Sequence, residues 1–336
     1  MSFVHDDRDF PQLLTLVTEE TRIAPALVEK DYWVTHCMWA LHQTGLDLWF
    51  KGGTSLSKGY GIIERFSEDL DLTCDIRKLI PDLMGGDSSL PSSRSQASKW
   101  TRAVRERLPA WIATNVRPVI EAALARDQLQ AQLEVGGEEN DKLLLHYPAL
   151  KSGSGYVRTV VTLEFGGRAT GEPHQALPVA CDMEGHVEGV SFPTAHPVVM
   201  SVARTFWEKA TAAHVYCAQG RIRSERYARH WHDLAAIARS RYGDEAITDR
   251  AVAAAVADHK AFFFLEKDAA GSVIDYKSAA TGNLRIVPEG AARDALQEDY
   301  AAMIGDGMLL GESLAFDQLM QVCSDIQERV NQAARP

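Results

Sequence analysis

The sequence predicts an α+β protein, in which a mixed α/β domain over residues 1–195 precedes a helical domain over residues 196–336. Three observations predict this. Short apolar or alternating runs typical of strands lie before residue 195. Beyond Pro197 the apolar residues recur at the spacing of amphipathic helices. The length of 336 residues allows two domains that each bury a core.

The expected elements follow from local signals. Pro25 suits the first turn of a helix over 24–44, and Gly45 ends it. An apolar strand at 48–50 enters the turn Gly52-Gly53, and residues 85–98 have the composition of a loop. The remaining expected elements are helices at 9–20, 54–60, 99–126, 199–217, 224–241, 246–258, 290–304 and 315–333, and strands at 70–74, 128–136, 142–147, 156–166 and 177–182.

Composition excludes several classes of protein. Hydrophobic residues make up 46% and charged residues 24%, as in a globular protein, and no apolar run approaches the roughly 20 residues of a membrane helix. The N-terminus MSFVHDDRDF lacks the basic start and apolar core of a signal peptide, so we expect a cytoplasmic protein without a membrane partner. The net charge of −11 argues against general electrostatic binding to nucleic acid, although a local basic groove stays open.

Two aspartates mark a metal site. Asp69 and Asp71 lie on an expected strand, where alternate side chains share one face. Two carboxylates so close repel one another unless a cation lies between them, and their hard oxygens suit Mg²⁺ or Mn²⁺. The glycines upstream let the backbone approach a phosphate, and the following helix offers unpaired N–H groups. Together these features indicate phosphoryl or nucleotidyl transfer.

The order strand, GG(S/T), helix, strand with DxD resembles the nucleotidyltransferase superfamily of polymerase β type. The resemblance extends to the AbiEii/AbiGii toxin family of nucleotidyltransferases. It is carried by EKDYWVTH, KGGTSLSKGYGIIERFSEDLDL, VTLEFGGRATGEP, ARTFWEKATAAH, RYARHWHDL and LRIVPEG…ALQEDYAAMIG, in that order, from about residue 20 to 333. The implied fold is a polymerase β-type domain followed by helices.

The resemblance implies roles for individual residues. Gly52, Gly53 and Thr54 would hold the nucleoside triphosphate (NTP). Metal ions would bind three carboxylates, those of Asp69, Asp71 and Glu164. Two residues of the later motifs, Lys209 and Asp233, would also be catalytic, and Lys209 would contact nucleotide phosphate. Some relatives carry an acidic residue where this chain has His230.

Two groups of arginines are possible tracks for a polynucleotide, because phosphate neutralisation dominates nucleic-acid affinity. One contains Arg102 and Arg105, and the other contains Arg226 and Arg229. Arg226, Arg229 and Asp233 would share one helix face at spacings of three and seven. Solvated ion-pair faces are the alternative reading.

The function expected from the resemblance is metal-dependent transfer of a nucleoside monophosphate from an NTP to RNA, such as the 3′ end of tRNA. The protein would be the toxin of a toxin–antitoxin or phage-defence system, with a separate antitoxin protein. Two alternatives stay open. The same fold would nucleotidylate a protein or a small molecule, or it would be a catalytically silent binding module.

Overall fold

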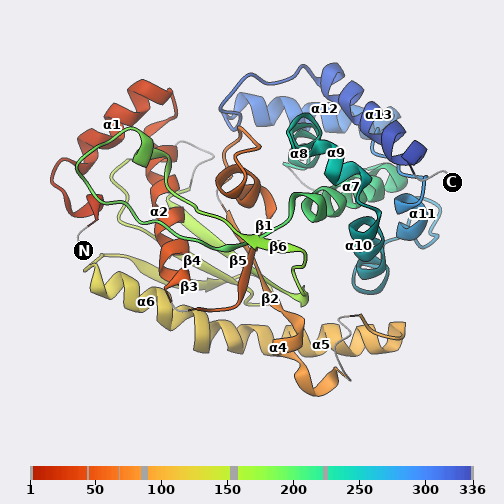
Figure 1. Cartoon of the computed structure of the whole chain (residues 1–336), viewed down its shortest axis with the longest axis horizontal. Coiled ribbons are helices and arrows are strands. Elements are labelled where there is room, and N and C mark those ends of the chain that lie inside the picture. Colours follow the sequence, from red (N-terminus) through yellow and green to blue (C-terminus); the bar gives the residue numbers. More distant parts are fainter. Residues whose placement is uncertain are drawn as a thin grey trace. The chain divides into compact units, whose positions relative to one another are not determined.

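The computed structural model describes residues 3–43, 45–67, 69–84, 90–151, 158–221 and 226–333 (Figure 1). The chain divides into two compact units. The first comprises Met1–Tyr60, Phe66–Gly85 and Arg102–Val199, and the second comprises Gly61–Arg65, Gly86–Thr101 and Met200–Pro336. A search of the described ranges finds no helix with the length and apolar character of a membrane span.

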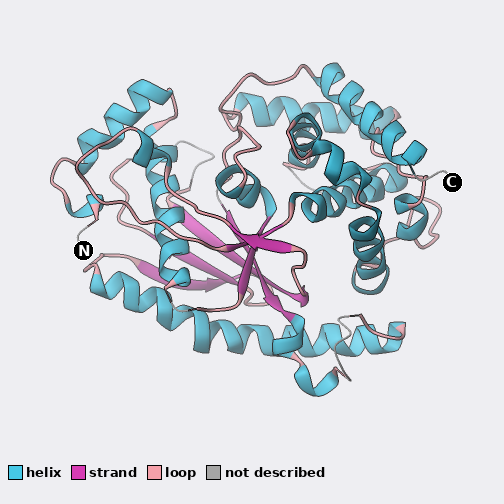
Figure 2. Cartoon of the chain, in the orientation of Figure 1, coloured by secondary structure: helices cyan, strands magenta, loops and turns pink. Residues whose placement is uncertain are grey.

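Within the described residues, seven strands form a mixed sheet, which confirms the α+β class (Figure 2). The strand order is β3-β4-β5-β2-β1-β7-β6, with β2 parallel to β5 and antiparallel to β1. The strands are β1 (Leu48–Lys51), β2 (Asp69–Asp75), β3 (Gln132–Gly136), β4 (Lys142–His146), β5 (Val160–Ala169), β6 (His174–Ala176) and β7 (Val198–Met200).

The strands at the centre of the sheet alternate between buried and accessible side chains. In β5, Val161 and Leu163 are fully buried, whereas Glu164 between Leu163 and Phe165 is partly exposed. In β2, Leu70 and Leu72 are buried and the aspartates beside them are accessible. One sheet face therefore packs on the core, and the other presents carboxylates.

Helices cover the sheet in the first unit. The helix α2 is buried along almost its whole length and packs against α1, α6 and β5. A π-helical turn, Ile112–Val116, lies just before Pro118, which has no N–H for the carbonyl four residues earlier. The helices are α1 (Phe10–Thr21), α2 (Pro25–His42), α3 (Gly52–Thr54, continued by a π-helical turn to Gly59), α4 (Ile76–Leu79), α5 (Arg94–Trp111, which begins in the second unit) and α6 (Arg117–Arg126).

The second unit is built around α7, whose Phe206 and Trp207 are fully buried. Ser201 caps its first turn by accepting a hydrogen bond from the Arg204 backbone N–H, and Gly220 ends it in the left-handed conformation. The helices of this unit are α7 (Val202–Gln219), α8 (Arg229–Arg239), α9 (Gly243–Thr248), α10 (Arg250–Phe263), α11 (Tyr276–Ala280), α12 (Gly290–Gly305) and α13 (Phe316–Ala333).

Several expected boundaries were wrong. No strand covers 177–182, where Val179 forms only an isolated bridge with Ala195. The helix expected over 246–258 is two helices, because Asp249 ends α9 and its side chain caps α10. The loop expected over 85–98 ends where α5 begins at Arg94, and residues 85–89 of that segment lie outside the described residues.

Candidate functional site

A row of carboxylates lies on one face of the sheet in the first unit. The parallel register of β2 and β5 places Asp71 beside Glu164 and Asp69 beside Thr162. Asp69 and Asp71 share a face because they are two positions apart on β2. The predicted strand geometry of all three acidic residues is therefore confirmed, while their roles in catalysis stay a prediction.

Two lysines flank this row, and neither has a role in the motifs described above. Lys51 on β1 is the register partner of Asp71, and a Cβ built on Gly166 of β5 would lie 3.6 Å from Lys51 Nζ. Lys142 on β4 is the register partner of Glu164 and forms an ion pair with its carboxylate. Burial acts against the Lys142 charge, but the hydrogen bond to Glu164 raises the pKa of the lysine. In the sequence, the only feature that could have pointed to Lys51 as a site residue is its position directly before the glycine turn.

The glycine turn approaches Asp71 closely. Gly52 has φ of +75°, in the left-handed region that favours glycine. A Cβ built there would stand 1.9 Å from Asp71 Oδ2 and 2.7 Å from Asp71 Cγ. Position 52 therefore requires glycine for two independent reasons, and the aspartate carboxylate lies against the backbone at the start of α3.

Thr54 ties this turn to β2. Its hydroxyl is buried and donates a hydrogen bond to the Asp69 backbone carbonyl at 2.6 Å, with the Ser67 carbonyl at 3.2 Å. Ser55, also buried, donates to the Gly52 carbonyl at 2.8 Å. In this structure the Thr54 hydroxyl, which we expected at phosphate, instead fixes the backbone of Asp69 relative to the turn.

The carboxylate row has the right donors for a divalent cation. Hard carboxylate oxygens on one face, next to a backbone turn free of side chains, are what Mg²⁺ and Mn²⁺ accept. The three carboxylates do not all lie within 4.8 Å of one another in the described residues, and Glu164 is paired with Lys142. The two aspartates on β2 are thus the core of the candidate metal site.

A buried ionic cluster occupies the second unit around Asp233 of α8. Arg65 donates from Nε to Asp233 Oδ1 and from Nη2 to Oδ2, both at 2.7 Å, and Lys209 Nζ of α7 lies 2.8 Å from Oδ2. The three side chains are 0–9% exposed. Sequence reasoning missed Arg65, although a buried aspartate on a helix requires a cationic partner.

The charges in this cluster set each other's protonation. Burial alone would raise the pKa of Asp233, but Arg65 and Lys209 hold it well below its usual range. Burial lowers the pKa of Lys209, as does the Arg65 charge, while Asp233 acts in the opposite direction. Burial, reinforced by Lys209 and Arg229, keeps the pKa of His230 well below its usual value. Asp233 is therefore ionised between its two cationic partners.

The predicted arginine face on α8 was wrong. The helix begins at Arg229, and Arg226 lies before it with φ of +64°. The Asp299 carboxylate accepts hydrogen bonds from the Arg226 and Ala228 backbone N–H groups, both at 2.6 Å, and so holds this turn outside the helix. Arg226, Arg229 and Asp233 therefore do not share a helical face.

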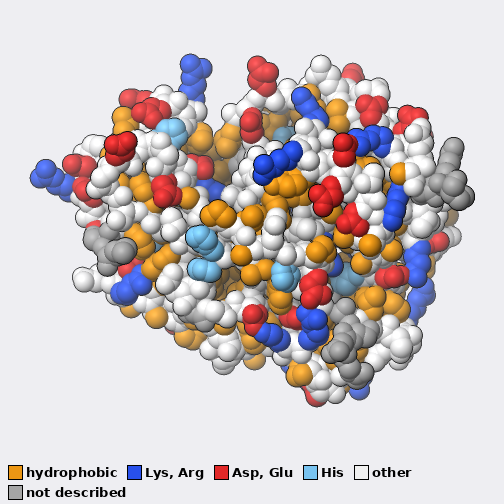
Figure 3. Space-filling view, in the orientation of Figure 1, with side chains coloured by type: hydrophobic (Ala, Val, Ile, Leu, Met, Phe, Trp, Pro, Cys, Tyr) orange, Lys and Arg blue, Asp and Glu red, His pale blue; other side chains and the backbone are white. Residues whose placement is uncertain are grey.

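The other arginine group is partly neutralised on α5. Arg102 is exposed, but Arg105 Nε lies 3.0 Å from Glu139 Oε1, and Arg107 forms a two-armed ion pair with Asp82. On the face that Figure 3 shows, Lys and Arg side chains are interspersed with Asp and Glu side chains. Surface ion pairs of this kind reduce the charge that a polyanion would meet.

The chain was also compared with known protein families, curated proteins and solved structures. A family model described as a nucleotidyl transferase AbiEii toxin of a type IV toxin–antitoxin system matches residues 37–322. Among solved structures, the chain is similar to MenT4, a nucleotidyltransferase toxin from Mycobacterium tuberculosis H37Rv, at 17% identity and a TM-score of 0.45, over 96% of this chain and 99% of that one. No curated protein sequence matches the chain.

Proposed function

Because the chain belongs to the AbiEii family of nucleotidyltransferase toxins from type IV toxin–antitoxin systems, we propose that it transfers a nucleoside monophosphate from an NTP to RNA with the help of a divalent metal ion. The family makes the protein a nucleotidyltransferase with an NTP substrate and an antitoxin partner. We further propose which metal ion, which acceptor and which residues take part in the reaction.

The observation that carries the proposal is the contact between Asp71 and Gly52. It brings a carboxylate of the candidate metal site against the turn proposed to hold the triphosphate. Asp69 and Asp71 would hold Mg²⁺ or Mn²⁺, with Glu164 as the third carboxylate of the row. When bound, such an ion neutralises phosphate charge and lowers the pKa of an attacking hydroxyl.

The chain itself positions the nucleotide. Gly52 and Gly53 present backbone without side chains, so phosphate oxygens can approach the N–H groups at the start of α3. Thr54 keeps that turn in register with β2 through its bond to the Asp69 carbonyl. Lys51 lies on the same sheet face as Asp71 and offers a cation to the triphosphate. Lys51 is therefore a further residue of the proposed nucleotide site, and the sequence alone did not indicate it.

Lys209 and Asp233 complete the proposed machinery. Lys209 contacts nucleotide phosphate as a point charge, and Asp233 fixes the position of its ammonium group through the 2.8 Å ion pair. Arg65 holds the other side of the same carboxylate and acts as a positioning residue.

The proposed acceptor is RNA, such as the 3′ end of tRNA, and the proposed antitoxin is a separate protein. Arg102 and Arg229 are exposed and would meet the RNA backbone, with Arg105 and Arg226 as further contacts. One observation favours a different acceptor. The net charge of −11 and the ion pair of Arg105 weaken any long-range attraction for RNA, so a protein or small-molecule acceptor is the second candidate.

A labelling experiment tests the proposal. The purified chain is incubated with Mg²⁺, total RNA and each α-³²P-labelled NTP in turn, and the products are separated on a denaturing gel and examined by mass spectrometry. We expect the label on RNA with the wild type and with Glu121→Gln, a surface control. Label on the protein fraction alone would move the proposal to the second candidate. If no label is incorporated into any acceptor under any condition, the remaining interpretation is a catalytically silent binding module.

A further inference from the structure

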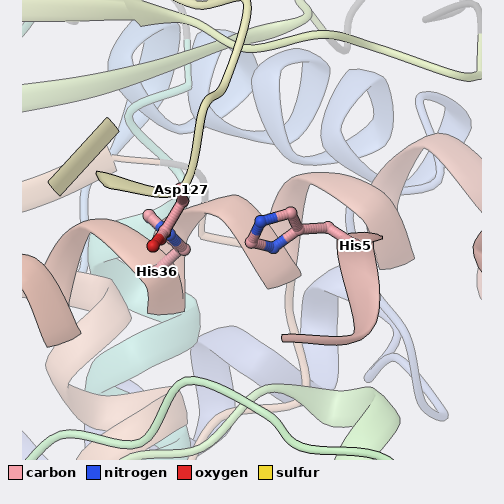
Figure 4. A group of neighbouring side chains, drawn as sticks. All are labelled: His5, His36 and Asp127. Atoms are coloured by element: carbon pink, nitrogen blue, oxygen red, sulfur yellow. The ribbon is translucent and has the colours of Figure 1, made fainter. Parts of the chain in front are cut away.

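A second group of possible metal ligands lies in the first unit and shares no residue with the carboxylate row on the sheet. It consists of His5, His36 and Asp127, which we call the histidine cluster (Figure 4). His5 lies in a short 3-10 helix, Val4–Asp6, His36 in the middle of α2, and Asp127 directly after α6. Each residue offers one ligand atom within 4.8 Å of the other two, a spacing found for no other such group in the described ranges.

His5 has a buried ring nitrogen without a hydrogen-bond partner. Its side chain is 3% exposed, and Nε2 forms no hydrogen bond, with a carboxylate oxygen of Asp6 3.6 Å away. The other ring nitrogen, Nδ1, lies 2.5 Å from the Tyr32 hydroxyl. If Nδ1 carries the proton and donates it to Tyr32, Nε2 presents a bare lone pair. Figure 4 shows the His5 ring pointing toward the other two side chains.

His36 and Asp127 hold each other directly. His36 Nε2 lies 2.8 Å from Asp127 Oδ2, and the two side chains are 1% and 6% exposed. The second oxygen of Asp127, Oδ1, accepts a hydrogen bond from Arg126 Nε at 2.9 Å. Arg126 Nη2 also donates a longer hydrogen bond, 3.3 Å, to Oδ2, so the arginine holds both oxygens and orients the carboxylate toward His36, as residues around metal ligands commonly do.

We propose that the histidine cluster is a structural metal site that binds one Zn²⁺ ion through His5, His36 and Asp127. Bonds of about 2.0–2.2 Å at tetrahedral angles separate ligand atoms by about 3.3 Å. The His36–Asp127 distance of 2.8 Å and the 4.8 Å limit for all three atoms leave only small side-chain movements to reach that spacing. The ion would take the place of the proton that His36 Nε2 shares with Asp127, and that proton would move to His36 Nδ1. Water or Asp6 would supply the fourth ligand.

The chemistry of the donors selects the class of metal. Two imidazole nitrogens and one carboxylate oxygen suit Zn²⁺ and neighbouring transition metals, whereas Mg²⁺ prefers oxygen ligands alone. Burial lowers the pKa of His36 to about 4 and also lowers that of His5, so both rings are neutral at pH 7, as metal ligands must be. The deep burial favours a structural role over a catalytic one.

A metal here would join three segments that are distant in sequence. The 3-10 helix Val4–Asp6 would be fixed to α2 and to the end of α6. Aromatic side chains already surround the cluster, with Phe3 and Trp39 rings at 6.0 and 5.4 Å from the His36 ring. The site would therefore secure the N-terminal segment against the helix that crosses the sheet.

Metal binding to the full, untagged chain tests this proposal. The protein is stripped with a chelator and dialysed against Zn²⁺ in excess Mg²⁺, so that Mg²⁺ competes for oxygen-only sites. Bound zinc is counted by mass spectrometry, and the melting temperature is recorded with and without zinc. We expect one zinc per chain, and the same count in Asp71→Asn and in His186→Gln, which removes a surface histidine paired with Glu20.

Two variants address the cluster itself. His5→Gln is expected to lose the bound zinc and the rise in melting temperature. Tyr32→Phe keeps all three ligands and removes only the partner of His5 Nδ1, so its zinc affinity should fall about 10–100-fold. Co²⁺ is the third probe, because four-coordinate Co²⁺ gives intense visible absorption that six-coordinate Co²⁺ does not.

Three results would overturn the proposal. They are a wild-type chain that binds no zinc in excess Mg²⁺, unchanged zinc binding in a folded His5→Gln variant, and a pale six-coordinate Co²⁺ spectrum of the wild type. The first and third need no variant, so they decide the matter even if His5→Gln does not fold. The proposed nucleotidyl transfer does not enter these measurements.

Discussion

Arg65 and Asp233, which are 168 positions apart in the sequence, form a two-armed ion pair with both distances at 2.7 Å. Asp233 is fully buried, and Lys209 is its other cationic partner. Removing one partner from a buried ion pair is costly, because the remaining charge loses its compensation. The cluster therefore links the stability of the helical unit to a lysine proposed to bind nucleotide.

We expect Arg65→Met and Lys209→Met each to lower the free energy of unfolding by about 3 kcal/mol, measured by urea denaturation. Arg117→Ala removes a surface pair with Glu121 and should cost no more than about 0.5 kcal/mol. Lys209→Met should weaken NTP binding much more strongly than Arg65→Met does. NTP binding is measured by calorimetry on the folded variants. Equal NTP affinity in Lys209→Met and the wild type would contradict the assignment of Lys209.

Gly52→Ala should abolish transfer. The new methyl group would overlap Asp71 Oδ2, and the left-handed φ would add strain of about 1–2 kcal/mol. Gly61→Ala is the matched control, since Gly61 has φ of +62° and no neighbouring atom within 4 Å of a built Cβ. It should lose similar stability in thermal unfolding and keep its activity. Equal activity losses in the two variants would show that strain, not contact with Asp71, explains the effect.

Asp69→Asn and Asp71→Asn should each abolish transfer and leave the fold intact. The substitutions remove a charged metal ligand, and asparagine keeps the size and polarity of the side chain at these partly exposed strand positions. Transfer is measured with the NTP label, and folding by circular dichroism and thermal unfolding. Wild-type activity in either variant would remove both the metal site and the proposed mechanism.

Stability should fall as the pH drops from about 6.5 to 4. Burial, and then the Arg285 charge, lowers the pKa of His214 to about 4, and its Nδ1 accepts a hydrogen bond from the Arg285 N–H. Below the usual histidine pKa of about 6.5 the unfolded chain binds a proton that the folded chain does not, so His214 contributes a loss of at most about 3 kcal/mol. His214→Gln should show a shallower slope in urea denaturation across this range, and an unchanged slope would contradict the prediction.

If RNA is the acceptor, transfer should fall steeply with added salt, because broken phosphate contacts let cations return to the polymer. Arg102→Glu with Arg105→Glu, and likewise Arg226→Glu with Arg229→Glu, should weaken RNA use without changing NTP binding. Arg102 and Arg229 should contribute most, because Arg105 is paired with Glu139 and Arg226 lies in a turn held by Asp299. Salt-insensitive transfer with full activity in both double variants would point to a protein or small-molecule acceptor.

The sequence by itself determined the features that depend on local pattern. Alternation predicted β2 and β5 and the faces of Asp69, Asp71 and Glu164, because the strand period of two is a property of the backbone. Helical spacing predicted α7, α12 and α13 within a few residues. The motif order led to the nucleotidyltransferase family, which the family match then confirmed.

Only the tertiary structure decided which distant residues meet. Three such meetings join segments that no local spacing relates. They are the register that sets Asp71 beside Glu164, the contact of Asp71 with Gly52, and the pairing of Arg65 with Asp233. The break before Arg229 likewise depends on Asp299, a side chain from another helix that satisfies backbone N–H groups and so overrides the helical pattern. The helix or strand propensity of a segment is only a weak preference. Long-range hydrogen bonds and burial determine whether the segment adopts the structure that its propensity favours.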